Sequence, residues 1–383
     1  MGNQPLKKRA LSLDLARGSM LLLIILAHVP LMMYLSEPGV ITKLHAENTF
    51  EKILNGLMVL FVDNRARPLF AALFGYGLMM IYKKQSERTG DIEAKRIIKR
   101  RCWYLILFGA VLMAVFGGQD ILMTYGIAGL ILIPLINRKN KTIMIWILIT
   151  AVIYTGIVFL VWGTILFGIQ SYSIPIELTG NETYLNTIFD RFIGIPLTPF
   201  MTHLMFPVIP SVIMGFWLGR LDVLIQPEKN RALLKRMFAG ASVISITGAV
   251  PMLFINEIWF PEYFTAGLVY GIHMISGIFA GPAYVALFAF IGHKIKQPGI
   301  LMQAMAAMGK RSLTFFCIHE IMIVICLSPI AFNLGAHITI TTGVLFGIIL
   351  WSVNLAAAWQ MEKHSKSGPL EHLMRRLVYR TDG

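Results

Sequence analysis

Three ionisable side chains lie in the first long apolar stretch of the chain. A carboxylate, a guanidinium and an imidazole are groups that occur in acid–base and ion-relay sites. Asp14, Arg17 and His28 all fall within RALSLDLARGSMLLLIILAHVP. On a helix that turns about 100° per residue, Arg17 and His28 lie roughly 20° apart on one face and about 16 Å apart along the axis, with Asp14 near the same stripe. Charged groups are costly in such a stretch, so we interpret them as a candidate site. Alternatively, Asp14 and Arg17 form a salt bridge at a membrane edge, and His28 lies at the opposite interface.

A second polar group lies late in the sequence, in GKRSLTFFCIHE. Ser312 and His319 are seven residues apart and therefore share one face of a helix, and Glu320 follows directly. A histidine can serve as a general base near neutral pH, and a nearby carboxylate can orient it and stabilise its charged form. The alternative is that His319 and Glu320 make a structural pair with another helix.

Two further polar groups flank apolar stretches. DNRARP carries Asp63, Arg65 and Arg67, and GGQD ends in Asp120. Arginine is well suited to bind the phosphates of a ligand. Alternatively, Arg65 and Arg67 are interfacial anchors paired with Asp63 or Asp120, and Asp120 caps the helix that follows it.

The composition predicts which elements position these groups. The 383 residues are 56% hydrophobic and only 14% charged, and the mean hydropathy is +0.68. A soluble domain has about 25% charged residues, and the apolar residues here come in blocks of about 18 or more, enough to span a bilayer. We therefore predict an all-α, polytopic membrane bundle that forms a single transmembrane domain over residues 1–383. No signal peptide is expected, because the first apolar block is too long and no small-residue cleavage site follows it.

Basic residues lie in the short loops between the predicted spans. Ten spans are expected, at residues 11–33, 66–83, 98–117, 120–136, 142–168, 198–219, 235–255, 265–292, 310–332 and 338–360. The basic clusters are Lys7 to Arg9, 83–101, 137–141, 227–236, 293–296 and the tail with Lys363, Lys366, Arg375, Arg376 and Arg380. With ten spans all of them fall on one side, which predicts that both termini are cytoplasmic. The net charge of +14 is thus a property of the loops and gives no indication of nucleic acid binding.

Two longer segments are expected on the outer side. Residues 34–65 contain the amphipathic piece FEKILNGLMVLFV, which lies in the interface or re-enters. Residues 169–197 are predicted to form a polar loop that includes Asp190 and Arg191. Within the spans, the GxxxG pairs at Gly215 and Gly277 predict close helix contacts.

Several motifs, taken in order, resemble the YeiB-like family of bacterial membrane proteins, which is named for a C-terminal domain of unknown function numbered 418. They are LDLARG (13–18), RPLFAALFGYG (67–77), RRCWYLILFGAVLM (100–113) followed by DILMTYG (120–126), GKRSLTFF (309–316) and GPLEHLMRR (368–376). The resemblance covers nearly the whole chain. It implies acyltransferase-like helices over residues 10–292 and the C-terminal part of the family domain over residues 293–383.

This family is similar to the superfamily of transmembrane acyltransferases, which includes acyltransferase family 3 and the heparan-glucosaminide acetyltransferases. In acyltransferase family 3 an Arg and a His with ten residues between them lie in the first helix, and the His is implicated in catalysis. Arg17 and His28 have that spacing, and the SLTFFCIH that ends in His319 is similar to a late helix motif of those enzymes. YeiB-like proteins usually carry Asn at the place of His28, and often Asn and Gln at Phe315 and His319. They often carry a His at the position that Leu112 occupies in this chain.

Together these observations predict transfer of an acyl group, expected to be acetyl, from cytoplasmic acyl-CoA to a hydroxyl of a cell-envelope glycan, lipid or small molecule. His28 is the expected base. The expected catalytic residues are His28, Asp14 and His319, and the expected donor- or substrate-binding residues are Arg17, Arg65, Arg67, Asp120, Ser312 and Glu320. Acyl-CoA is the expected co-substrate, with no tightly bound cofactor and no metal.

Two other classes of function are kept open. A proton-coupled transporter or exporter of a small amphiphile would use His319 and Glu320 as a relay, although the sequence lacks the repeat symmetry and paired broken helices typical of transporters. A non-catalytic membrane scaffold would not need buried ionisable residues. In each case we expect a multi-pass protein of the bacterial plasma membrane whose partner is the lipid bilayer, without nucleic acid, and a homo-oligomer is left open.

Overall fold

Helices make up nearly all of the regular structure of this chain. The computed structural model describes residues 11–34, 39–41, 43–174, 178–295 and 297–379. Within these ranges the β pairing is limited to two isolated bridges, Ile41 with Ser173 and Ile255 with Trp259. The predicted all-α class is therefore confirmed.

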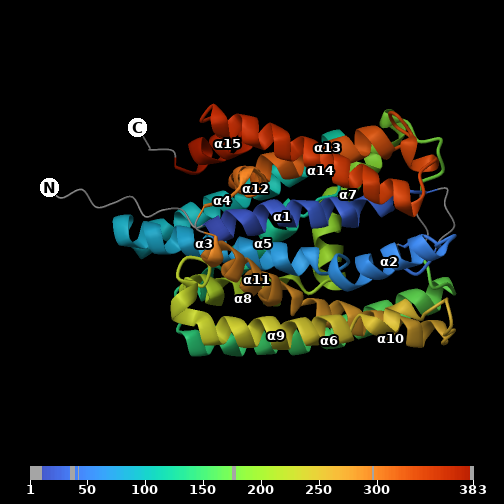
Figure 1. Ribbon diagram of the computed structural model, residues 1–383, viewed down its shortest axis with the longest axis horizontal. Helices are drawn as coiled ribbons and strands as arrows, with labels where there is room; N and C mark the ends of the chain where they lie inside the picture. Colours follow the sequence, from blue (N-terminus) through green and yellow to red (C-terminus); the bar gives the residue numbers. More distant parts are fainter. Residues whose placement is uncertain (1–10, 35–38, 42, 175–177, 296, 380–383) are drawn as a thin grey trace.

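The α-helices follow one another along the chain with short connections (Figure 1). They are α1 (Leu11–His28), α2 (Thr49–Phe61), α3 (Ala66–Thr89), α4 (Asp91–Val111), α5 (Leu122–Leu132), α6 (Asn140–Ile169), α7 (Tyr184–Met205), α8 (Val208–Arg220), α9 (Arg231–Thr247), α10 (Tyr263–Gly277), α11 (Ala280–Lys294), α12 (Ile300–Lys310), α13 (Ser312–Leu327), α14 (Ile340–Lys363) and α15 (Pro369–Val378). A π-helical turn, Leu112–Phe116, continues α4. Short 3-10 turns are Val29–Met32, Ile133–Leu135, Pro227–Asn230, Val250–Leu253 and Leu334–Ala336.

Some of the predicted spans are long and apolar enough to cross a membrane. In the described residues, five segments meet this criterion: Leu11–Met32, Asn140–Ile169, Pro227–Leu253, Tyr263–Lys294 and Ile340–Lys363. A sixth candidate is the pair of α7 and α8, which is bent by 75°. Leu122–Leu135 and α13 are apolar but shorter. The spans predicted at 66–83 and 98–117 lie in α3 and α4, which also carry charged extensions.

The basic connections lie at one end of the bundle. Figure 1 shows the start of α1, the end of α14 and α15 at the same end of the long axis. The turns between α3 and α4, α5 and α6, α8 and α9, and α11 and α12 lie there as well. Lys7, Lys8, Arg9, Lys296 and Arg380 lie outside the described residues. The other predicted basic clusters therefore share one end, as the loop pattern requires.

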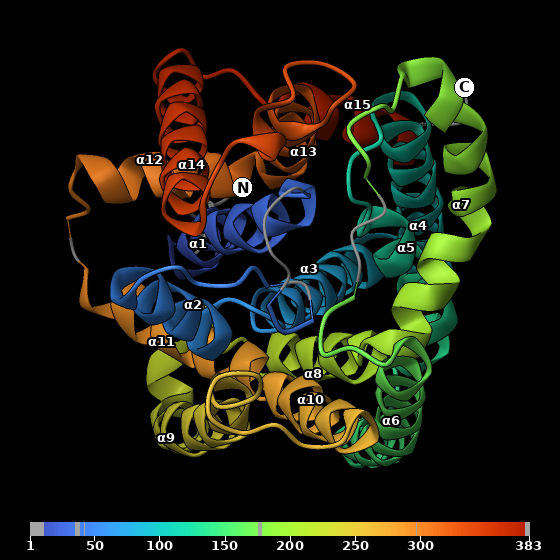
Figure 2. The same ribbon diagram turned by 90° about the vertical axis from the view of Figure 1, so that its right-hand side faces the viewer.

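The predicted outer loop over residues 169–197 is wrong in its second half, because residue Tyr184 begins α7. The side chain of Thr183 accepts a hydrogen bond from the N–H of Asn186 at 3.3 Å and so caps this helix. Large apolar side chains recur along α7 and are exposed, namely Leu185, Phe189, Phe192, Ile193, Leu197 and Phe200. Pro196 and Pro199 lie inside the helix and obscure its pattern. α7 runs across the bundle rather than along it (Figure 2).

Close helix contacts occur where the small residues predicted them. A Cβ on Gly215 of α8 would overlap the carbonyl oxygen of Ala72 in α3, and a Cβ on Gly277 of α10 would overlap Asn64. The amphipathic piece after residue 49 forms α2, as its pattern indicated. Seen along the bundle, α1 and α3 lie in the interior with the other helices around them (Figure 2). One of these two central helices, α1, thus carries Asp14, Arg17 and His28.

Candidate functional site

The side chains of His28 and Glu320 meet between α1 and α13. Nδ1 of His28, the last residue of α1, lies 2.6 Å from Oε1 of Glu320. The Glu320 side chain is 1% exposed and that of His28 is 13% exposed. A buried carboxylate at this distance fixes the orientation of the ring, while Nε2 remains available to a ligand. The pair therefore has the arrangement of a base oriented by an acid.

His319 lies beside the same carboxylate. Its Nε2 is 3.1 Å from Oε1 of Glu320, the side chain is completely buried, and the ring packs edge-on against Phe316. Among the groups that the structure describes, Nδ1 of His319 and Oε2 of Glu320 have no hydrogen-bond partner. Since buried polar atoms are nearly always hydrogen-bonded, these two atoms are suited to a ligand, a water molecule or a moving proton.

A glycine turn covers Glu320 on the side of α4. The π-helical turn Leu112–Phe116 leads into it, and such turns are frequent at functional sites. Gly117 has a φ of +70°, which favours glycine. A Cβ on Gly118 would lie 3.2 Å from Cβ of Glu320. A side chain at this position would be in tight contact with Glu320, so the glycine lets the turn pack closely against it.

Asp120, at the end of this turn, caps α5. Its Oδ1 accepts a hydrogen bond from the N–H of Leu122 at 3.0 Å, and its Oδ2 accepts one from the N–H of Met123 at 2.9 Å. Gly109 of α4 leaves room for the carboxylate. The structure therefore places Asp120 in the capping role that was the alternative to a place in the site.

Arg191 reaches the other side of the glycine turn, and sequence reasoning missed it. The residue lies in α7 and is 8% exposed. Its Nη2 donates a hydrogen bond to Oγ1 of Thr187 at 2.8 Å, and the guanidinium lies 5.0 Å above the ring of Tyr184. Within the described ranges, buried Nη1 has no hydrogen-bond partner. The spacing of Tyr184, Thr187 and Arg191 on one helical face was the available signal.

Arg65 holds helices together. Its guanidinium is almost fully buried, with Nη1 at 2.9 Å from the ring nitrogens of His273 and Nη2 donating to the carbonyl of Ser245 at 2.7 Å. Nη1 also donates to the backbone carbonyl of Asp63, whose carboxylate pairs with Lys43. These contacts join the start of α3 to α9 and α10.

Arg67 contacts the bend between α7 and α8. Its Cζ lies 3.6 Å above the ring of Phe206, a cation–π contact. The backbone carbonyl of Arg67 accepts a hydrogen bond from the hydroxyl of Tyr125 at 3.0 Å. The residue is half-buried and joins α3 to α5 and to the start of α8.

Asp14 and Arg17 lie well away from His28. Asp14 is buried, and its carbonyl faces Gly309 of α12, where a Cβ would not fit. The guanidinium of Arg17 lies over Gly77 of α3. Both residues make further interactions. Eleven helical positions, about 16 Å, separate Arg17 from His28, so one compact site cannot include both.

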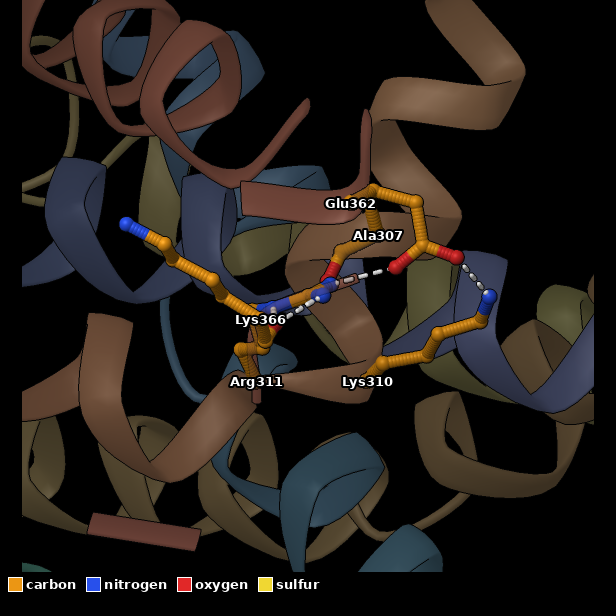
Figure 3. Close-up of polar contacts among 5 residues, drawn as sticks. All are labelled: Ala307, Lys310, Arg311, Glu362 and Lys366. Carbon is orange, nitrogen blue, oxygen red and sulfur yellow. Dashed lines mark hydrogen bonds and ion pairs between the residues drawn. The ribbon is translucent and has the colours of Figure 1, made fainter. Parts of the chain in front are cut away.

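Ser312 begins α13, two turns before His319, and it follows a cluster of charges (Figure 3). In this cluster Nη1 of Arg311 donates to Oε2 of Glu362 at 2.7 Å and to the carbonyl of Ala307 at 2.9 Å. Nε of Arg311 donates to the carbonyl of Lys366 at 2.9 Å. The cluster joins α12, α13 and α14.

The C-terminal helix also holds the start of α13. Oε1 of Glu371 accepts hydrogen bonds from the N–H of Leu313 at 2.8 Å and of Thr314 at 3.2 Å. Oε2 accepts one from the hydroxyl of Thr314. Ser312 therefore lies at a helix start whose nearby donors are already engaged by the chain itself.

A cavity of about 280 Å³ lies elsewhere, between α2 and the segment from Met252 to Ile258. None of the predicted site residues lines it. In the part of the chain that the structure describes, no group of His, Cys, Asp and Glu side chains could hold a metal ion.

The regions of this chain that match known proteins include helices of the candidate site. Residues 218–381 match the model of a protein family of unknown function (DUF418), a stretch that includes His319 and Glu320. "Uncharacterized protein YxaH" of Bacillus subtilis (strain 168) is 24% identical over 347 residues, covering 84% of this chain and 81% of its own. An "Uncharacterized 39.9 kDa protein in amylase 3'region" of Bacillus acidopullulyticus is 24% identical over 375 residues, covering 98% and 95%. These matches agree with the YeiB-like resemblance, and their names state no activity.

Proposed function

We propose that this chain is a multi-pass protein of the bacterial plasma membrane with ten spans. The support is the apolar surface of its peripheral helices, where Leu148, Leu160, Val243 and Val353 are each more than half exposed. Soluble monomers rarely expose apolar patches larger than a few hundred Å². The basic connections at one end support a cytoplasmic location for the start of α1. His28, at the far end of α1, then lies in the outer half of the bundle.

We further propose that the protein transfers an acyl group, expected to be acetyl, from cytoplasmic acyl-CoA to a hydroxyl of an acceptor. The observation that carries this proposal is the 2.6 Å contact between Nδ1 of His28 and buried Glu320. Hydrogen bonding through Nδ1 holds the tautomer in which Nε2 carries a lone pair. That nitrogen can remove a proton from a hydroxyl placed beside it.

The reaction balances with these two side chains. Nε2 of His28 takes the hydroxyl proton while the hydroxyl oxygen attacks the thioester carbonyl carbon. The C–S bond then breaks, and the leaving thiolate receives the proton from Nε2. Glu320 stabilises the imidazolium formed between the two steps. Arg17 lies nearer the cytoplasmic end of α1, where it is placed to meet a phosphate of the donor.

Purified protein in detergent tests this proposal directly. Labelled acetyl-CoA binding and release of free thiol are measured for the wild type, for His28→Ala and for the control His372→Ala, which alters an exposed histidine of α15. We expect all three proteins to bind acetyl-CoA, and turnover by His28→Ala to fall by about 100-fold or more. Equal turnover in His28→Ala, or no binding of any acyl-CoA, would overturn the proposal.

A proton-coupled transporter is the second candidate, and one observation favours it. His319 and Oε2 of Glu320 form a buried, incompletely bonded group next to His28. Such a chain of titratable side chains is suited to pass protons. Proteoliposomes with an internal pH dye and no acyl-CoA separate the two functions. A proton flux that the wild type carries and Glu320→Gln lacks would favour transport.

A further inference from the structure

Arg191 is a buried cation for which the described chain supplies no counter-ion. The residue is 8% exposed, its Nη2 bonds to the neutral hydroxyl of Thr187, and its Nη1 bonds to nothing in the described residues. Burying a charge is costly unless a partner compensates it. A buried guanidinium that lacks a counter-ion in the described chain is suited to bind an anionic ligand.

The nearby carboxylates are engaged elsewhere. Both oxygens of Asp120 accept hydrogen bonds from the start of α5, and Oε1 of Glu320 contacts His28. Neither makes an ion pair with Arg191 in the part of the chain that the structure describes. The guanidinium instead faces the backbone of Gly117, where a Cβ would lie 3.0 Å from Cζ of Arg191.

The same turn joins Arg191 to the proposed catalytic pair. Gly117 faces Arg191, and its neighbour Gly118 faces Glu320. The guanidinium of Arg191 thus approaches this dipeptide from α7, and the Cβ of Glu320 approaches it from α13. Each of these side chains also has a buried atom without a hydrogen-bond partner in the described residues, Nη1 of Arg191 and Oε2 of Glu320. An anionic group bound at Arg191 would hold the rest of its molecule beside His28 and Glu320.

We propose that Arg191 and the Gly117–Gly118 turn form a binding subsite for a phosphate group on the acceptor. Guanidinium groups bind phosphate with two parallel hydrogen bonds, and the free Nη1 supplies a donor. Calling the ligand the acceptor rests on the proposed acyl transfer, whereas the phosphate site stands without it. The helix that carries Arg191 exposes Leu185, Phe189 and Ile193, so a membrane lipid with a phosphate headgroup could reach the site from the bilayer.

The test measures binding rather than turnover. Full-length protein is purified in a neutral detergent, and bound phosphatidylglycerol and phosphatidylcholine are quantified by native mass spectrometry. Binding of labelled glycerol phosphate is measured in parallel, as the soluble source of the same chemistry. The variants are Arg191→Gln, Arg191→Lys and the control Arg96→Gln, which alters a 58% exposed arginine at the other end of the bundle. Monodispersity in size-exclusion chromatography verifies folding.

We expect Arg191→Gln to weaken phosphate binding by about tenfold or more, since a hydrogen bond to a charged group is lost. Arg191→Lys should retain much of the binding, and Arg96→Gln all of it. Loss confined to phosphatidylglycerol assigns the site to a lipid, and loss of glycerol phosphate binding assigns it to a soluble ester. Equal binding of every probe by folded Arg191→Gln and wild type overturns the proposal. Because His28→Ala should bind phosphate normally, failure of acyl transfer alone leaves this result intact.

Discussion

The start and the middle of α13 hold buried charges in opposite ways. At its start, Arg311 is 6% exposed, and its nitrogens donate to Glu362 and to the carbonyls of Ala307 and Lys366. Near its middle, Glu320 is equally buried, but within the described structure its Oε2 and Nδ1 of neighbouring His319 have no hydrogen-bond partner. The first group joins three helices, whereas the second joins two and keeps spare bonding capacity.

This contrast distinguishes the Arg311 cluster, which stabilises the fold, from the Glu320 cluster, whose spare hydrogen-bonding atoms we attribute to function. A satisfied cluster loses stability when one member is removed, because the remaining groups are left without partners. A cluster with unbonded polar atoms already costs stability, so its members are retained for another reason. Substitutions at the start and in the middle of α13 should therefore produce opposite patterns of activity and stability.

The largest expected effect is on activity, at Glu320. Glu320→Gln removes the charge that stabilises the imidazolium of His28, and we expect acyl transfer to fall by about 100-fold or more. The midpoint of thermal unfolding in detergent should stay the same or rise. Glu362→Gln is the matched control from the other cluster, and it should lower the midpoint without lowering turnover of the folded protein. If the two variants behave alike, the distinction between the clusters is lost.

The next effect is on stability, at Arg311. Arg311→Met keeps the length of the side chain but leaves the carbonyls of Ala307 and Lys366 without this donor. We expect the free energy of unfolding to fall by about 2–3 kcal/mol. Thermal unfolding followed by tryptophan fluorescence measures the loss, and the turnover per folded molecule should not change. An unchanged midpoint would mean that this cluster contributes little to the fold.

The sequence predicted the helical class and the polar residues of α1 and α13, because apolar blocks and isolated charges are local features. It did not predict that His28 contacts Glu320, since 292 residues separate them and only the packing of α1 on α13 brings them together. The stripe shared by Arg17 and His28 was geometrically sound, yet the helix is long enough that Arg17 meets α3 and His28 meets α13.

The errors have physical causes as well. Residues 169–197 were predicted to form a polar loop, but the capped start at Thr183 and the large apolar side chains of α7 stabilise a helix from residue 184. Arg191 was therefore missed. The contacts of Arg65 with α9 and α10 were not predicted, because its partners Ser245 and His273 are 180 and 208 positions away in the sequence. A sequence shows where a charge is but not which distant groups meet it.

A smaller loss of stability is expected at Glu371, which caps α13 from the C-terminal helix. Glu371→Gln keeps one acceptor but removes the negative charge at the helix N-terminus, where the dipole favours an anion. We expect a loss of about 1 kcal/mol, and an equal turnover per folded molecule. Denaturant titration in detergent against Glu93→Gln, a surface ion-pair variant, measures the difference. A tenfold loss of turnover would show instead that the cap adjusts the position of His319.

The smallest expected effect is on turnover, at Gly118, which packs against Glu320 of α13. A Cβ on Gly118 would lie 3.2 Å from Cβ of Glu320 and 3.4 Å from Leu112, so Gly118→Ala should displace the carboxylate by a few tenths of an ångström. Catalytic geometry is sensitive to shifts of this size, and we expect turnover to fall several-fold with little change in stability. Gly168→Ala is the control, since a Cβ there meets nothing within 4 Å. Equal turnover in both variants would show that the position of Glu320 is not critical, and His28 would then act without a precisely held partner.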